Sequence, residues 1–440
     1  MSSSPLDTAE VKPSFLSTYI SRVKAFSRNA RLYLIGVVVS GIAMGVQGLL
    51  FNFYVLSLGF NEAVIGNIVT VRSATALIAA LPMGYLADRI GRRQAFMIGT
   101  ISIAIANATM LLFPSVPVFL AMNILLGLGQ SIASVAMGPF LMENSTEVER
   151  TYLFSFASGL NMLSVSIGQW IGGYLPTWMS EMLGSRPDST MAYAASLAFV
   201  VGGVALSLIP NVMIRTPRTQ GSERNVFAPL AYYKADPKGL SRLVLPGLIV
   251  SIGAGLIMPF MNVFFRNVHH QSDSAIGVLF AWASLAMGLG LLIAPSLAER
   301  YGKIQVVVVT QALSIPFLII LGFSGSLVPA IAAYYLRTML MNMSNPVYST
   351  FAMEQVKTEH RGMIASLMNM AHQFGWAFSP TISGFIQVRW GFKPAFLLTI
   401  LLYSISIWLY YAFFWRQLRR KASAAVSPNP TADPTDMPAL

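Results

Sequence analysis

The sequence contains no cysteine among its 440 residues, which excludes disulfides and thiolate metal sites. Histidine is also scarce, and the four present lack the spacing of metal ligands, because His269 and His270 are adjacent while His360 and His372 stand apart. The sequence shows no phosphate-binding glycine loop and no nucleophile paired with a base. We therefore expect no metal, no cofactor and no catalytic residues, and we do not expect an enzyme.

Charged residues make up only 10% of the chain, whereas a soluble domain carries about 25%. The hydrophobic share is 55% and the mean hydropathy is +0.62. The apolar residues form long runs, such as 32–56, 94–113 and 396–415, each near the roughly 20 residues that a helix needs to cross about 30 Å of hydrocarbon. Because the backbone of a lipid-exposed segment must satisfy its own hydrogen bonds, these runs predict an all-α integral membrane protein.

Breaks between the apolar runs divide the chain into twelve predicted transmembrane helices. The segment before the first run is polar and basic and has no apolar core, so we do not expect a cleaved signal peptide. The predicted spans cover residues 32–57, 63–87, 94–113, 117–141, 152–176, 191–212, 243–265, 274–297, 305–323, 327–351, 362–387 and 395–415.

The basic residues indicate how the chain crosses the membrane. With the N-terminus in the cytoplasm, most of the 29 Lys and Arg fall in cytoplasmic segments, and the external loops hold only Arg186, Arg266, Arg389 and Lys393. This bias follows the positive-inside rule and predicts a multi-pass protein of the cell (plasma or inner) membrane with both termini in the cytoplasm. Contact with anionic headgroups of the lipid bilayer explains the net charge of +12, and we expect no nucleic-acid partner.

The two halves of the sequence repeat one another at a constant spacing of 211 residues. The charged segment Gly84–Gln94 corresponds to Pro295–Gln305, and Glu143 corresponds to Glu354. Because each half has an even number of spans, the halves are predicted to be parallel six-helix repeats related by an axis along the membrane normal. The predicted parts are a cytoplasmic N-terminal tail (1–31), an N-terminal bundle (32–212), a cytoplasmic linker (213–242), a C-terminal bundle (243–415) and a disordered cytoplasmic tail (416–440).

The charged segment after the second span carries the pattern G-x-L-a-D-R-x-G-R-R. Its positions here are Gly84, Leu86, Asp88, Arg89, Gly91, Arg92 and Arg93. With twelve spans in two parallel halves, the sequence resembles the major facilitator superfamily, and in particular its drug/proton antiporters, over roughly residues 32–415. The second copy is degraded, since Pro295 replaces the first glycine and Glu299 replaces the aspartate. The resemblance implies a secondary transporter whose two bundles rock about a central cavity.

Residues at the cytoplasmic helix ends are predicted to form a gate. Asp88 can accept hydrogen bonds from the amino end of a helix in the other half, whose dipole favours an anion, and Arg92 lies within reach of Glu143. Such a cluster would hold the inner face shut while the outer face is open. The predicted gate residues are Gly84, Asp88, Arg89, Gly91, Arg92, Glu143, Glu299, Arg300 and Glu354, the last of which would pair with Arg300 or Lys303.

The fifth span bears on the direction of transport. Exporting members of the family carry the motif G-x6-G-x3-G-P-x2-G-G in this span, and all the matching positions here are small except one. These positions are Ala157, Ser164, Gly168, Gln169, Gly172 and Gly173. Ordinary helix packing also requires small residues, and the resemblance favours export over uptake.

Three ionisable residues lie near the middle of predicted spans, where a charge is costly and marks a functional position. Arg72 and Arg337 predict a positive cavity that suits a carboxylate or phosphate. No Asp or Glu lies mid-span, so His372, which titrates near neutral pH, is the predicted proton-coupling residue. The resemblance places spans one, four, seven and ten around the cavity, and their predicted substrate contacts are Gln47, Asn52, Tyr54, Asn123, Gln130, Asn262, Tyr334, Tyr335 and Asn342.

Three hypotheses for the function remain open at this point. The first is a proton-coupled exporter of a small organic solute that works as a monomer by rocker-switch alternating access. The second is a carrier for a small organic anion, a carboxylate or phosphate held by Arg337 and Arg72. The third is a membrane receptor or scaffold that has the same fold and transports nothing.

Overall fold

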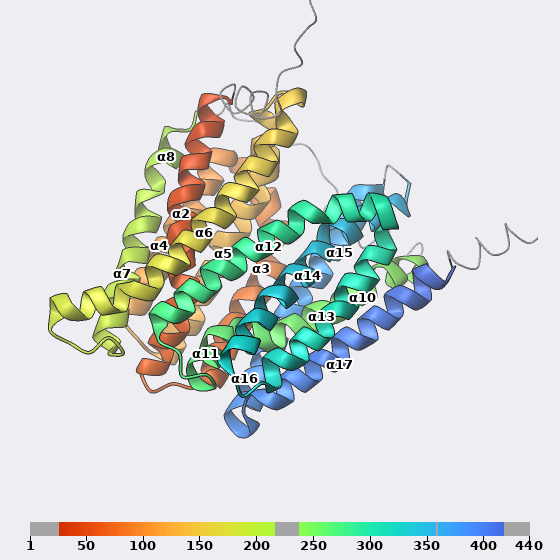
Figure 1. The fold of residues 1–440 in the computed structure, drawn as a ribbon. Coiled ribbons are helices and arrows are strands. Elements are labelled where there is room, and N and C mark those ends of the chain that lie inside the picture. The colour runs from red at the N-terminus through yellow and green to blue at the C-terminus, as the bar shows by residue number, and fades with distance from the viewer. Residues whose placement is uncertain (1–25, 216–236, 358–359, 418–440) are drawn as a thin grey trace, which may run out of the picture.

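The computed structural model describes residues 26–215, 237–357 and 360–417. Within these ranges the chain is helical, with short connections between the helices (Figure 1). Most of the two predicted tails and most of the predicted linker 213–242 lie outside the described residues.

Over residues 26–215, the described part of the first half, the chain forms six membrane crossings. They are α2 (Arg28–Ser57), α3 (Glu62–Ile90), α4 (Arg92–Leu112), α5 (Val116–Glu143), α6 (Glu147–Leu183), and α7 (Thr190–Leu206) continued by α8 (Leu208–Met213). We call this part the N-half.

The second half also forms six crossings, two of which are interrupted. They are α10 (Pro237–Ile257) with the 3-10 turn η1 (Met258–Phe260) and α11 (Met261–Asn267), α12 (Asp273–Tyr301), α13 (Lys303–Phe323), α14 (Leu327–Glu354), α15 (Arg361–Trp376) with α16 (Ser379–Trp390), and α17 (Phe392–Tyr410) with the π-helical turn η3 (Tyr411–Trp415). We call this part the C-half. Within the described residues, the two halves together contain the twelve helical crossings expected from the sequence.

Nine of the crossings in the described residues have both the length and the apolar composition of a membrane span. The other three are α6, α14 and the α15–α16 pair, which carry more polar residues or a break. Because each half crosses an even number of times, both described chain ends lie on one side of the bundle. We call that side the terminal face and the opposite side the distal face.

Equivalent residues begin and end equivalent helices in the two halves. Asn61 caps α3 by accepting a hydrogen bond from the backbone of Val64, and Ser272 caps α12 in the same way. Gly91 and Gly302 follow these helices at φ 92° and 90°, a conformation that glycine adopts without the penalty of a side chain. The chain can therefore turn at once into α4 and α13, which keeps the adjacent crossings close together.

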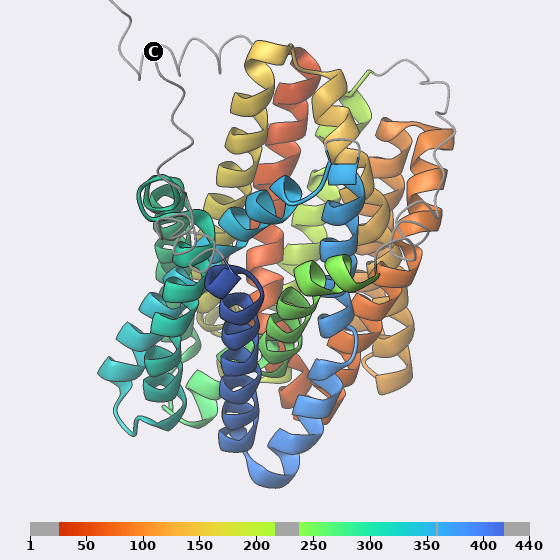
Figure 2. The ribbon, with the colours of Figure 1, turned by 90° about the vertical axis from the view of Figure 1, so that its right-hand side faces the viewer.

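Two equivalent seams join the halves, α3 against α16 and α6 against α12 (Figures 1 and 2). A Cβ on Gly66 would lie 2.3 Å from the carbonyl oxygen of Pro380, and one on Gly277 would lie 2.7 Å from that of Gln169. Such close backbone approach requires glycine. Both seams lie in the distal part of these helices, so the tightest packing between the halves is near the distal face.

The structure differs from the predicted span limits in three places. The described part of helix α10 begins at Pro237 rather than at residue 243. Helix α6 extends beyond 152–176, from a Thr146–Glu149 capping box to the left-handed Gly184. The eleventh crossing is two helices, because Pro380 has no N–H to donate to the carbonyl four residues earlier.

Candidate functional site

Each half contains a cavity in its terminal-face part. The N-half cavity has a volume of about 670 Å³ and the C-half cavity about 550 Å³. Many of the residues that line one cavity correspond to residues that line the other at the 211-residue spacing, for example Gly36 and Gly247, Ser40 and Ser251, Thr100 and Gln311, Ser158 and Asn369, and Asn161 and His372. The two cavities are therefore repeats of one structural site, and their chemical differences can be compared position by position.

The C-half cavity contains Arg337, which is only 2% exposed. One terminal nitrogen of its guanidinium donates to the Tyr403 hydroxyl at 2.8 Å, and the other contacts the Met258 sulfur at 3.0 Å. Its Nε is buried and has no hydrogen-bond partner among the described residues. A buried cation is costly unless it is paired, yet no side chain lining this cavity in the described part of the chain carries a carboxylate.

Two further predicted residues line the C-half cavity. Asn342 donates to the backbone carbonyl of Thr338 at 2.8 Å. His372 exposes its side chain, and its ring lies 6.4 Å from that of Trp376. Trp376, which the sequence analysis did not select, has a buried indole nitrogen without a partner among the described residues.

The N-half cavity differs in charge. Of the described side chains around it, none is an acid, a base or a histidine. Gln130 is the predicted substrate contact that lines it. Leu126 corresponds to Arg337 in the repeat and is buried in the apolar core. The charged character is therefore confined to one of two otherwise equivalent cavities.

Asn52 and Asn262, predicted as cavity residues, join the two halves instead. The Asn52 amide donates to the Asn262 side-chain oxygen at 2.9 Å and to the Pro259 carbonyl at 2.7 Å. Asn262 in turn donates to the Leu49 carbonyl at 2.8 Å. These buried bonds connect the distal part of α2 with η1 and α11.

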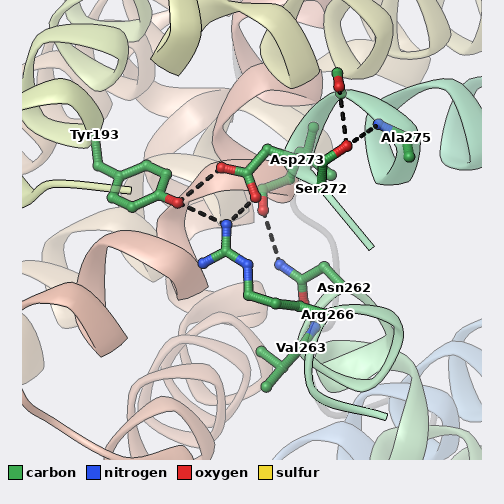
Figure 3. A network of polar contacts seen from close by, with 9 residues as sticks. Tyr193, Asn262, Val263, Arg266, Ser272, Asp273 and Ala275 are labelled. Atoms are coloured by element: carbon green, nitrogen blue, oxygen red, sulfur yellow. Dashed lines mark hydrogen bonds and ion pairs between the residues drawn. The ribbon is translucent and has the colours of Figure 1, made fainter. Parts of the chain in front are cut away.

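A second distal contact joins the halves beside this pair (Figure 3). Arg266 of α11 donates to the hydroxyl of Tyr193 on α7 at 2.6 Å and pairs with Asp273 at the start of α12. Tyr193 donates to the same carboxylate at 2.7 Å. The guanidinium also lies over the Phe53 ring of α2, 3.4 Å from its centre. We call these four residues the distal cluster.

The distal cluster was not predicted from the sequence. Arg266 was expected in an external loop, and Asp273 was not among the predicted site residues. One signal was available, because Asp273 corresponds to Glu62 in the repeat and both begin helices at the distal face. Nothing in the local sequence connects Tyr193 with residues of the other half.

The predicted gate residues form two separate groups at the terminal face. In the N-half, Arg92 pairs with Asp88 and its Nε lies 3.4 Å from a Glu143 oxygen. In the C-half, Lys303 pairs with Glu354, at the positions equivalent to Arg92 and Glu143. Among the described residues, neither group forms an ion pair between the two halves. The side chains of Arg89, Glu299 and Arg300 are exposed.

The remaining predicted gate glycines act in packing and turning. A Cβ on Gly84 would lie 3.3 Å from Val135 on α5. Gly91 supplies the left-handed turn described above. The arrangement holds Arg92, which is 9% exposed, between its two acids.

Several predicted substrate contacts are engaged inside the bundles. Gln47 donates to Asn107 at 2.6 Å, and Asn123 donates to the carbonyl of Phe119 at 2.8 Å, both with buried side chains. Tyr54 and Tyr334 are also buried, among aromatic rings. These side chains face protein partners and do not line either cavity.

Two predicted contacts are only partly buried. Tyr335 lies beside Tyr334, with ring centres 6.3 Å apart. Arg72 is partly buried and lines neither cavity. The structure thus separates Arg72 from Arg337 and does not bring them to one site.

The match to a family model decides the family. The model described as the Major Facilitator Superfamily matches residues 33–246 and again residues 243–434. The chain belongs to the Major Facilitator Superfamily. The resemblance carried by the charged motif is thereby confirmed, and the chain is a multi-pass membrane transporter and not an enzyme.

Similar proteins agree with this family. The multidrug resistance protein MdtG of Dickeya zeae (strain Ech586) is 24% identical over 409 residues, which covers 90% of this chain and 96% of that protein. The crystal structure of the nucleoside transporter NupG shares the fold with a TM-score of 0.69 at 13% identity, over 88% of this chain and 98% of that chain. A bacterial homologue of the human lysosomal transporter Spinster, in an inward-facing and occupied conformation, has a TM-score of 0.71 at 15% identity, over 94% of this chain and 99% of that chain.

Proposed function

We propose that this superfamily member is a proton-coupled secondary transporter that exports a small organic solute across the cell (inner) membrane by alternating access, as a monomer. One observation carries the proposal. Two repeat-equivalent cavities lie in the terminal-face parts of the halves, while hydrogen bonds and glycine contacts join the halves near the distal face. This is the arrangement expected of one end state of a transporter that rocks about a central site.

The orientation in this proposal rests on the basic residues. They concentrate in the tails and in the connections of the terminal face, so the positive-inside rule assigns that face to the cytoplasm. The cavities would then open toward the cytoplasm, and both termini would be cytoplasmic.

The direction of transport rests on the relatives more than on the fifth span. Gly168 and Gly172 pack against α2, where a Cβ on Gly168 would lie 2.1 Å from the Ile42 carbonyl oxygen. Helix packing therefore accounts for these small residues whatever the direction. Export is supported by the MdtG relatives, whose name describes multidrug resistance proteins.

The opposite end state would exchange one set of contacts for another. Opening the distal face would separate the distal cluster and the Asn52–Asn262 pair. Closing the terminal face would bring Asp88, now paired with Arg92, to the other half. Because such contacts contribute only about 1 kcal/mol each, the two states can remain within the few kcal/mol that permit exchange.

His372 is the proposed proton carrier. Its exposed side chain lines the C-half cavity, and no described acidic side chain lines either cavity. A neutral imidazole in a water-accessible cavity can accept a proton and later release it.

Transport by purified protein in proteoliposomes tests this function. Flux of aromatic solutes, including naphthamide and naphthoate, would be measured with a pH gradient of either polarity, against protein-free liposomes. We expect protein-dependent flux that responds to the gradient, and a loss of that response in His372→Gln. Flux equal to that of protein-free liposomes for every solute would refute the transport function, whereas a retained gradient response in His372→Gln would refute only the proton assignment.

A further inference from the structure

We propose that the C-half cavity binds the anionic group of an amphipathic organic anion through Arg337 and Trp376, while the N-half cavity accommodates the apolar body. The inference rests on the proposed transport function, because it names the class of solute that the cavities would take. It assigns Trp376 a binding role and leaves Arg72 out of the site.

The first support is the unfinished bonding of Arg337. Its two terminal nitrogens contact Tyr403 and Met258, neither of which carries a negative charge. Among its other N–H donors, Nε–H is buried and has no partner among the described residues. Because removing a guanidinium from water without a counter-charge is costly, an anion that enters the cavity would supply the missing partner.

The second support is the set of other unpartnered polar atoms at the same cavity. The Trp376 indole nitrogen is a buried donor, and the Gln311 side-chain oxygen is a buried acceptor, and neither has a partner among the described residues. Buried polar groups in native proteins are nearly always hydrogen-bonded. The cavity therefore has two free donors, on Arg337 and Trp376, and one free acceptor, on Gln311. The two donors can bind an anionic oxygen group, and the acceptor can bind a hydrogen-bond donor elsewhere on the same molecule.

The third support is the repeat itself, which supplies an internal comparison. Each of the three unpartnered groups has a counterpart in the N-half at the 211-residue spacing. Leu126 occupies the position equivalent to Arg337, Val165 that equivalent to Trp376, and Thr100 that equivalent to Gln311. Leu126 and Val165 carry no polar side-chain atoms, and the Thr100 hydroxyl is satisfied by the Phe96 carbonyl at 2.8 Å.

The N-half cavity is suited to the apolar body of the solute, because the equivalent positions there leave no polar group without a partner. Its wall includes Met44, Phe96, Ile103 and Met137, with neutral polar groups such as Gln130 between them. Aromatic and thioether side chains adapt well to flat organic molecules. A solute long enough to reach both cavities would place its charge in the C-half, because the reverse orientation would leave Arg337 without an anionic partner.

Equilibrium binding to the purified full-length chain tests the proposal. The probes are radiolabelled naphthoate and the uncharged naphthamide, which share an aromatic body and differ in charge. We expect naphthoate to bind more tightly than naphthamide. We expect Trp376→Phe, which keeps the ring and removes the N–H, to weaken naphthoate binding about tenfold, the effect of a hydrogen bond to a charged group, with naphthamide binding unchanged.

Two variants complete the design. Arg337→Gln should abolish the preference for naphthoate, and if it is not recovered as monodisperse protein, Arg337→Lys, which keeps the charge and loses Nε–H, takes its place with an expected partial loss. Trp408→Phe is the matched control, because Trp408 is 63% exposed on α17 and lines neither cavity. It should leave both affinities unchanged.

The outcomes separate this proposal from the transport function. Equal affinity for the two probes, or a preference for naphthoate that persists in the Arg337 and Trp376 variants, would overturn the anion site even if proteoliposomes transport naphthamide. An Arg337-dependent preference for naphthoate would support the site even if no solute crosses the membrane.

Discussion

Replacing Arg266 by glutamine should shift the protein toward a state with an open distal face. The substitution removes the bond from Arg266 to Tyr193 and the contact of the guanidinium with Phe53, both of which cross between the halves. It leaves the bond between Tyr193 and Asp273 in place. A hydrogen bond to a charged group contributes about 1.5–3 kcal/mol, and a cation over an aromatic ring contributes about 0.5–2 kcal/mol.

Because the Arg266 side chain is 24% exposed, water weakens both contributions, and we take about 2 kcal/mol for the pair. At about 1.4 kcal/mol per factor of ten, this corresponds to about a thirtyfold rise in the ratio of distal-open to distal-closed protein. The size of this shift makes it measurable by chemical labelling.

The absence of native cysteine provides the assay. Val263 is fully buried on α11 beside the distal contacts, and Val263→Cys places one thiol there. Its rate of reaction with a hydrophilic maleimide reports the open population, and it should rise in the Arg266→Gln background. The matched control is Arg186→Gln, since the Arg186 side chain is 87% exposed and pairs with Asp188 in the same loop. Labelling indistinguishable from this control would refute the role of the distal cluster.

Three further predictions concern packing, the gate and coupling. Gly168→Val should lower the midpoint of thermal unfolding, because its Cβ would meet the Ile42 carbonyl oxygen at 2.1 Å, and an unchanged midpoint would contradict the close packing of α6 on α2. Asp88→Asn should weaken the closed state of the terminal face. It should therefore slow transport and lower the distal-open fraction measured by the Val263→Cys thiol, and normal values of both would refute the gate proposal. His372→Gln should retain solute binding while losing the response of flux to a pH gradient, whereas unchanged coupling would exclude this residue as the proton carrier.

The fold was accessible from the sequence because its two signals are strong. Bilayer-length apolar runs indicated the helices, and the 211-residue spacing indicated the repeat. The limits of the spans were less accessible where a helix leaves the apolar region, as α6 does, or where a proline divides a crossing, as Pro380 does. Hydropathy reports contact with lipid, and it does not report where backbone hydrogen bonds stop.

The site was less accessible, for a physical reason. A polar side chain inside a membrane helix needs a hydrogen-bond partner, but the sequence does not indicate whether that partner is a solute or another helix. Gln47 is bonded to Asn107 and Asn52 to Asn262, so protein partners account for three predicted substrate contacts, Gln47, Asn52 and Asn262. Arg337 was recognisable because a mid-span cation without an acid nearby is rare, whereas Trp376 resembles any lipid-facing aromatic residue until its nitrogen is seen to be buried.

The two seams are equivalent in the repeat but differ in the continuity of their helices. Helix α6 crosses as one continuous helix, and its Gln169 side chain accepts a hydrogen bond from Ser284 at 3.0 Å. On the other seam, the equivalent position is Pro380, and the crossing is divided between α15 and α16. When one bundle moves against the other, the eleventh crossing would therefore bend at the break between α15 and α16, whereas α6 would move as one continuous unit. A pseudo-symmetric protein built in this way would begin to open at the seam between α3 and α16, before the seam between α6 and α12.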